Sequence, residues 1–123
     1  MKRWIAREID KEIRLMSETV IRVGGAPVTL INVFDVDASK QQELIDLLNE
    51  GTEKVIKNRP GFVSVNILAS VDGTRVVNFA QWRSQDDVKA TMADPEVQSL
   101  GKRTAELAKP APHVYSVVSI HHA

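Results

Sequence analysis

The stretch PGFVSVNILASVDGTRVVNFAQWRS, residues 60–84, decides the fold of this chain. It holds two runs rich in β-branched and aromatic residues, 62–70 and 75–83, with Asp72-Gly73 between them. An Asp-Gly pair between two such runs is a strong signal for a β-hairpin, because glycine readily adopts the positive φ that tight turns require. This stretch therefore predicts two paired antiparallel strands.

The residues before the hairpin predict a strand and then a helix. Residues 27–37, PVTLINVFDVD, have the composition of a strand. Ser39 and Gln42 form a capping-box pattern, and apolar residues then recur at helical spacing. Pro60-Gly61 is expected to end this helix.

The residues after the hairpin predict two helices and a last strand. Ser84 is expected to cap a short helix, and Asp94-Pro95 to begin another. Pro110 ends the helical region, and HVYSVVSIH, residues 113–121, predicts a strand. The resulting order, β-α-β-β-α-β, is that of a ferredoxin-like α+β fold, in which an antiparallel sheet carries helices on one face.

The first twenty residues predict an additional helix, because apolar residues recur there at three- and four-residue steps between charges. Gly24-Gly25 interrupts the pattern. The predicted organisation is therefore an N-terminal helix with its linker at residues 1–25 and a folded domain at residues 26–123. The helix is expected to dock on the domain or on a subunit partner. Its polar face carries both charge signs, which argues against anionic lipid.

The composition is that of an ordinary globular domain. Its 123 residues suit one domain, and 16 basic residues balance 16 acidic ones, which gives no pull toward nucleic acid. The absence of cysteine excludes disulfides, thiolate nucleophiles and cysteine-based metal sites. No stretch approaches the ~20 apolar residues of a membrane span, and the charged N-terminus lacks the apolar run of a signal peptide. We therefore expect a cytoplasmic protein with no membrane partner.

The predicted sheet has two apolar faces. Ile31 and Val33 point away from the face that holds Phe34. Val77 and Phe79 repeat this alternation on the third strand. Two helices can cover only one face, and the second face is too apolar to stay in water. Either the N-terminal helix or a second copy covers it, and we favour a homodimer because one helix is narrow for such a sheet.

The hairpin stretch and its surroundings resemble the antibiotic biosynthesis monooxygenase family. VTLINVFDV is similar to the opening strand of the family, QQELIDLLNEGTEKV to its first helix and ADPEVQSLGKRTAELA to its second helical region. The resemblance covers about residues 27–121. It implies a dimeric α/β barrel whose subunits bind small aromatic molecules between the sheet and the helices. It also implies, from the best-characterised relatives, oxygenation of polycyclic phenols or quinols without metal or flavin.

Asn78 and Trp82 are the candidate catalytic residues. They lie four residues apart on one predicted strand, so both point to the same side. The amide and the indole N–H can both donate to a phenolate oxygen. The pair resembles the site pair of the cofactor-free monooxygenases. The alternative is that Trp82 packs in the core and Asn78 satisfies a neighbouring backbone group.

Four further residues are predicted to bind the substrate. Asn32 is a mid-strand amide among apolar residues and needs a partner or a ligand, and Phe34 follows two residues later. Leu68 stands where some monooxygenase relatives carry a histidine. Arg103, or its neighbour Lys102, is a candidate for the cationic residue with which some members polarise a substrate oxygen.

No metal or other cofactor is predicted. Heme-degrading relatives need a histidine at the position of Gly101, or one residue to either side, and no histidine precedes His113. Adjacent His121 and His122 would point to opposite strand faces, which disfavours a metal site.

Two functions follow from the sequence. The first is a cofactor-independent monooxygenase that acts on a phenolic or quinol-type aromatic with dioxygen. The second is a small-ligand binding or sensing dimer without turnover, because no general base is evident near Asn78. The N-terminal helix is a candidate contact for a larger oligomer.

Overall fold

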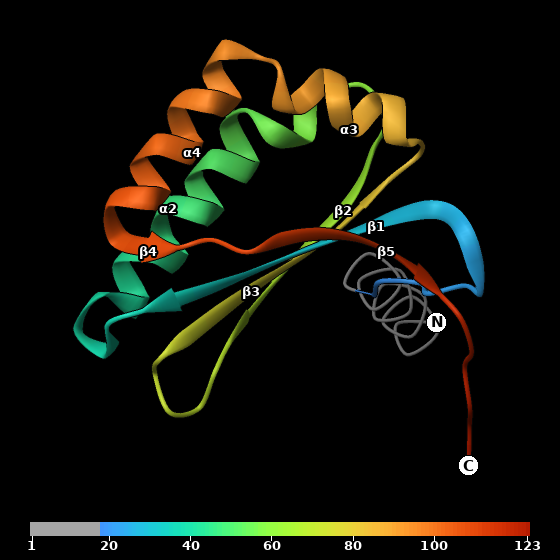
Figure 1. Cartoon of the computed structure of the whole chain (residues 1–123), viewed down its shortest axis with the longest axis horizontal. Coiled ribbons are helices and arrows are strands. Elements are labelled where there is room, and N and C mark those ends of the chain that lie inside the picture. The colour runs from blue at the N-terminus through green and yellow to red at the C-terminus, as the bar shows by residue number, and fades with distance from the viewer. Residues whose placement is uncertain (1–17) are drawn as a thin grey trace, which may run out of the picture.

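The computed structural model describes residues 18–123, so residues 1–17 of the predicted N-terminal helix lie outside the described part. One antiparallel sheet forms the base of the domain (Figure 1). Its strands run in the order β2-β3-β1-β4, and β5 also pairs with β1. Their bounds are β1 Gly24–Val36, β2 Phe62–Ala69, β3 Arg75–Trp82, β4 Ala108–Lys109 and β5 Pro112–Val117.

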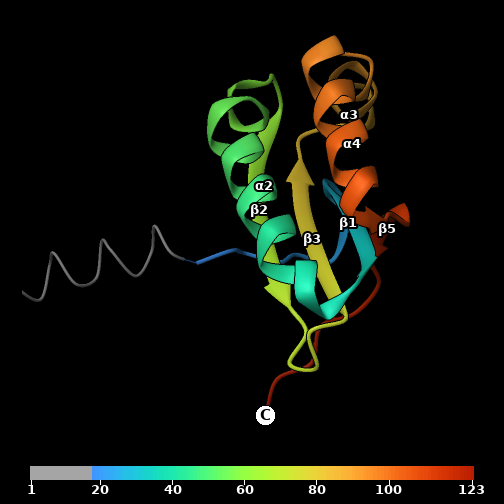
Figure 2. The same cartoon turned by 90° about the vertical axis from the view of Figure 1, so that its left-hand side faces the viewer.

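The helices lie together on one face of this sheet (Figures 1 and 2). Helix α2 follows β1, whereas α3 and α4 follow the β2–β3 hairpin, and α2 and α4 lie side by side. The bounds are η1 Ala38–Lys40, α2 Gln41–Lys54, η2 Ile56–Asn58, α3 Gln85–Met92 and α4 Pro95–Leu107. The predicted α+β, ferredoxin-like arrangement is confirmed.

The core forms where the strands meet the helices, in two clusters. One gathers Phe34, Val36, Leu44, Val76 and Ala108. The other gathers Val28, Ala80, Trp82 and Val88. The strand residues of both clusters lie on one face of the sheet, the face that holds Phe34 in the predicted alternation. The fold therefore puts Asn78, which lies between Val76 and Ala80 on β3, on the helix-covered face.

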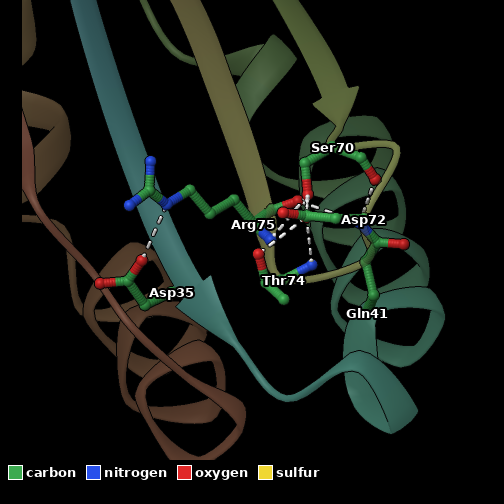
Figure 3. Close-up of polar contacts among 6 residues, drawn as sticks. All are labelled: Asp35, Gln41, Ser70, Asp72, Thr74 and Arg75. Atoms are coloured by element: carbon green, nitrogen blue, oxygen red, sulfur yellow. Dashed lines mark hydrogen bonds and ion pairs between the residues drawn. The ribbon is translucent and has the colours of Figure 1, made fainter.

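The β2–β3 turn is built as the Asp72-Gly73 pair predicts (Figure 3). Gly73 has a φ of +82°, a conformation that side chains with a Cβ rarely adopt. One carboxylate oxygen of Asp72 accepts from the main-chain N–H of Thr74 at 3.0 Å and from the hydroxyls of Thr74 and Ser70. These bonds favour the charged form and lower the pKa of Asp72 to about 2, with the main-chain bond from Thr74 the largest cause.

Gln41, at the start of α2, joins the hairpin to the helix layer (Figure 3). Its Nε2 donates to the main-chain oxygens of Ser70 at 3.1 Å and Arg75 at 3.0 Å. Arg75 in turn reaches across to Asp35 on β1, with 3.3 Å between Nε and Oδ1. The far end of the sheet is thus tied to the helix layer by polar contacts.

Capping before α2 differs from the prediction. Asp37, not Ser39, is the cap: its Oδ1 accepts from the Ser39 N–H at 2.9 Å at the start of η1. Gln42 instead donates to Asp46, one turn further along the helix. The predicted capping box is wrong because a carboxylate two residues upstream is the stronger acceptor. By contrast, Ser84 caps α3 and Asp94 caps α4 as predicted.

Two strand ends also differ from the prediction. Strand β1 begins at Gly24, inside the predicted linker, because Gly24 pairs with Val117 beyond an irregularity in the ladder. Strand β5 ends at Val117 rather than His121. The two ends are linked because β1 and β5 are antiparallel. Residues after Val117 would have to pair with residues before Gly24, and those residues are not part of a strand.

The face of the sheet opposite the helices is met by the chain before β1. The Gln81 side chain donates from Nε2 to the main-chain oxygen of Val20 at 2.8 Å, and the Thr19 hydroxyl bonds to the Asn66 amide. These contacts join the chain before β1 to β2 and β3. Within residues 18–123, no helix has the length and apolar character needed to cross a lipid bilayer.

Candidate active site

The candidate site is a pair of adjoining cavities between the sheet and the helices. They measure about 250 Å³ and about 170 Å³ and share Asn32, Asn78 and Met92 as lining residues. The larger is otherwise lined by Leu30, Ala80, Val88 and Pro112. The smaller is otherwise lined by Phe34, Leu47, Leu48, Gly51, Thr52, Ile56, Val97, Leu100, Gly101 and Thr104. A pocket of this kind suits an apolar ring that carries a few polar atoms.

Two amides stand at the junction of the cavities because β1 and β3 pair in register. Asn32 on β1 is the cross-strand partner of Asn78 on β3. Directly opposed residues on antiparallel strands share a face, so both side chains lie under the helices. Asn32 Oδ1 accepts from the Ala111 N–H at 3.0 Å. Asn78 Oδ1 is buried and has no hydrogen-bond partner among residues 18–123.

An unpartnered buried acceptor is unusual in a folded protein and points to a missing partner. The hydroxyls that line the smaller cavity do not supply one. Thr52 donates to the Leu48 carbonyl at 2.7 Å, and Thr104 to the Gly101 carbonyl at 2.8 Å. The polar character that the cavities offer to a ligand is therefore concentrated in the two amides.

Trp82 lies on the same face as Asn78 but deeper in the core. It is 1% exposed, and its ring meets that of Phe62 edge-on, with centroids 5.7 Å apart. It packs in the cluster of Ala80 and Val88, two residues that line the larger cavity, although Trp82 itself is not among the lining residues. Its Nε1–H is buried and has no partner in the described part of the chain, so the indole keeps an unused donor next to the cavity wall.

The remaining predicted site residues are divided between the cavity and the surface. Phe34 lines the smaller cavity and is buried. Leu68 pairs with Val77, so it lies on the open face of the sheet, where it is half exposed. Arg103 lies in an outer groove formed by α2 and α4, among the acidic residues Glu43, Asp46, Glu50 and Glu106. The fold does not bring Leu68 or Arg103 to the amide pair.

No ionisable side chain is among the described residues that line the two cavities. The groups whose pKa is shifted belong to turns: Asp72, described above, and Asp37, whose pKa is lowered by the hydrogen bonds from Ser39. Within residues 18–123, no three His, Asp or Glu side chains are grouped to hold a metal ion. The amides can orient a ligand and stabilise charge on it. The described lining residues include no acidic or basic side chain that could take up a proton from the ligand.

Two glycines of the site could have been noticed in the sequence. A glycine inside a helix costs about 1 kcal/mol relative to alanine, so it marks a close approach or an open space. A Cβ at Gly51 would lie 3.1 Å from the Leu100 methyls, which shows that α2 and α4 approach closely there. A Cβ at Gly101 would meet nothing within 4 Å. Met92 also lines both cavities and was not predicted. It is 44% exposed, and no sequence motif distinguishes a methionine that lines a cavity from one on the surface.

Comparison with known proteins agrees with this architecture. Residues 27–103 match the family model described as antibiotic biosynthesis monooxygenase. The chain is 46% identical over 84 residues to tetracenomycin-F1 monooxygenase of Streptomyces glaucescens, an alignment that covers 68% of this chain and 75% of that protein.

Solved structures give the same result. The ActVA-Orf6 monooxygenase of Streptomyces coelicolor, in complex with nanaomycin D, superposes with a TM-score of 0.71 at 29% identity, covering 80% of this chain and 93% of that one. SnoaB of Streptomyces nogalater, described as a cofactor-independent oxygenase, superposes with a TM-score of 0.69 at 20% identity, covering 76% and 94%. At that identity the SnoaB match concerns the fold alone.

Proposed function

The chain belongs to the antibiotic biosynthesis monooxygenase family, and from this we propose that it oxidises a phenolic or quinol-type aromatic molecule with dioxygen and without a cofactor. The observation that carries the proposal is the opposed pair Asn32 and Asn78 in an otherwise apolar cavity. The names of the relatives support the reaction class, because two of them are monooxygenases above 25% identity.

The chemistry needs little from the protein because the substrate supplies the electrons. Loss of a proton from an electron-rich phenol gives an anion, which passes one electron to dioxygen. The resulting radical and superoxide combine to form a C–O bond. The peroxide takes up the proton released at the start. Loss of the hydrogen from the same ring carbon, with breakage of the O–O bond, then leaves one oxygen there as a carbonyl and releases the other as water. The site contributes by binding the ring, stabilising the anion and excluding water.

Within this proposal, Asn78 contacts the reacting hydroxyl and Trp82 supplies an N–H donor to its oxygen. The support for Asn78 is its place in the wall of both cavities. The support for Trp82 is its unpartnered indole N–H beside Ala80 and Val88. Phe34 and Asn32 bind the ring. Leu68 and Arg103 have no part in the site of a single subunit, given their positions.

The direct test is oxygen uptake by metal-free protein with a panel of anthrones and hydroquinones. The wild type is expected to consume oxygen in proportion to substrate, and Asn78→Ala to lose most of that rate. Trp82→Phe keeps an aromatic ring against Phe62 and removes only the N–H donor, so a loss of rate in that variant reports on the donor. Uptake at background level, equal in the wild type and Asn78→Ala, would remove the proposal for that panel.

A second candidate function is ligand binding or sensing without turnover. It is favoured by one observation, the absence of ionisable side chains among the described lining residues. The two candidates differ in the fate of the ligand. A compound that raises the melting temperature and is recovered chemically unchanged after incubation in air supports binding alone.

We also propose that the open face of the sheet pairs with a second copy. The support is the set of apolar side chains on that face, with Leu68 half exposed and Tyr115 47% exposed. The N-terminal residues are proposed to extend this assembly beyond a dimer. Solution mass before and after deletion of residues 1–17 tests that second step, and an unchanged oligomer would dismiss it.

A further inference from the structure

The link between β4 and β5 touches the site in an unusual way. The link and the first residue of β5 together read Pro110-Ala111-Pro112. Proline has no main-chain N–H, so Ala111 is the only one of the three residues that can donate a main-chain hydrogen bond. That single donor goes to the Asn32 side chain, with 3.0 Å between N and Oδ1. The Ala111 carbonyl accepts from the Val33 N–H at 3.3 Å, which holds the link against β1.

This contact fixes the orientation of the Asn32 amide. The Ala111 N–H can only donate, so the atom that faces it must be the carbonyl oxygen of Asn32. The NH₂ group of Asn32 is then the part that remains for the cavity that Asn32 lines. A net hydrogen bond of ordinary strength favours this orientation over the flipped one by roughly fivefold.

The opposite amide has the complementary character. Asn78 Oδ1 is buried and accepts from no donor in the described part of the chain. Because Asn32 and Asn78 are cross-strand partners, a donor and an acceptor stand next to each other in the wall of the cavity. A ligand that fits both presents an oxygen to Asn32 and a hydroxyl hydrogen to Asn78.

We propose that the Ala111 main-chain N–H is a positioning group that sets Asn32 as the hydrogen-bond donor of the cavity and leaves Asn78 as its acceptor. The proposal rests on the proposed function for the aromatic nature of the ligand. The arrangement of one donor and one acceptor follows from Ala111, Asn32 and Asn78 themselves. It selects rings that carry a hydroxyl beside a second oxygen.

The first test uses alizarin (1,2-dihydroxyanthraquinone), a ring already at the quinone level whose 2-hydroxyl stands beside a second oxygen and whose visible absorption changes when that hydroxyl ionises. The apparent pKa of the bound probe is measured by absorbance against pH for each variant. In Asn32→Asp a carboxylate still accepts from Ala111 but offers no donor and adds negative charge. The affinity for the ionised probe is expected to fall about tenfold or more, and the apparent pKa to rise accordingly.

Ala111 is tested by a matched pair of variants. Ala111→Pro removes the N–H and releases the Asn32 amide, so the affinity for the ionised probe is expected to fall by roughly fivefold. Ala111→Gly keeps the N–H and is expected to leave it unchanged. The proposal would be overturned if the bound probe had the same apparent pKa in Ala111→Pro as in the wild type. It would also be overturned if the wild type did not bind the probe at all.

A second measurement needs no ligand and does not depend on the folding of Ala111→Pro. Hydrogen exchange at the Ala111 amide is expected to be slow in the wild type and at least about threefold faster in Asn32→Val, which offers no acceptor. Equal exchange rates in the two proteins would overturn the proposal. Failure of the proposed function can be told apart from failure of this proposal. If the protein is not an oxygenase, oxygen uptake is nil, but the variants still differ from the wild type in probe binding and amide exchange as described.

Discussion

Asn32 and Asn78 face each other across β1 and β3. The side-chain oxygen of Asn32 accepts from the Ala111 N–H, whereas that of Asn78 has no partner within residues 18–123. Their neighbours on the same strand faces, Leu30, Phe34 and Ala80, are apolar. A lone acceptor in such surroundings reduces stability, because its water contacts are lost and not replaced. The pair is therefore better explained by a ligand than by folding.

Asn78→Leu tests this relationship through stability. The change replaces an unpartnered acceptor with an apolar side chain of similar size. The free energy of unfolding is expected to stay within about 1 kcal/mol of the wild type or to rise, while ligand binding falls. Urea denaturation of both proteins, with probe titration alongside, makes the comparison. A loss of more than about 3 kcal/mol would mean that Asn78 holds the core together, as a buried structural polar group does.

Gly101 lines the smaller cavity. Gly101→Ala adds a Cβ that meets nothing within 4 Å, so it is expected to stabilise the protein by about 0.5–1 kcal/mol through helix propensity alone. Gly101→Phe is expected to fill the space and weaken binding of an aromatic ligand by about tenfold or more, without loss of stability. Thermal melts and probe titrations measure both effects. Unaltered binding in Gly101→Phe would show that ligands do not use this part of the cavity.

The open face of the sheet is tested with two lysine substitutions on the same hairpin. Leu68 lies on that face and is half exposed, whereas Val71 is in the turn and wholly exposed. Burying a lysine ammonium between two sheets is unfavourable, so Leu68→Lys is expected to convert a dimer to monomer and Val71→Lys to leave it intact. Sedimentation equilibrium reports the masses. If both variants sediment as the wild type does, the sheet face is not the contact.

Asp72 makes the hairpin sensitive to acid. Its pKa is lowered from 3.8 to about 2 by the bonds from Thr74 and Ser70, so its stabilising contribution is present above about pH 4 and is lost as the pH falls through 2. Asp72→Asn removes the charge and is expected to be less stable than the wild type at pH 7. The difference should shrink between pH 4 and pH 2.

Denaturant unfolding at pH 7, 4 and 2 measures this change for the wild type and Asp72→Asn. Asp86→Asn is the matched control, because this exposed aspartate in the first turn of α3 does not take part in the hairpin turn. A stability difference between the wild type and Asp72→Asn that stays constant down to pH 2 would contradict the assignment.

The sequence by itself determined the order of the main helices and strands, the hairpin turn, two of the helix caps and which strand residues share a face. These follow from local rules: the period of two in a strand, the preference of Gly73 for positive φ, and the acceptors of Ser84 and Asp94 at helix starts. That is why Asn78 and Trp82 could be placed on one face of their strand from the sequence.

The tertiary structure alone decided which of these residues reach the cavity. The register of β1 against β3 brings Asn32 opposite Asn78, and the packing of α4 turns Arg103 toward an outer groove while Gly101 lines the cavity. The bond from Ala111 to Asn32 joins residues 79 positions apart. A pattern of near neighbours carries no information about such contacts, because they depend on how whole elements pack against one another.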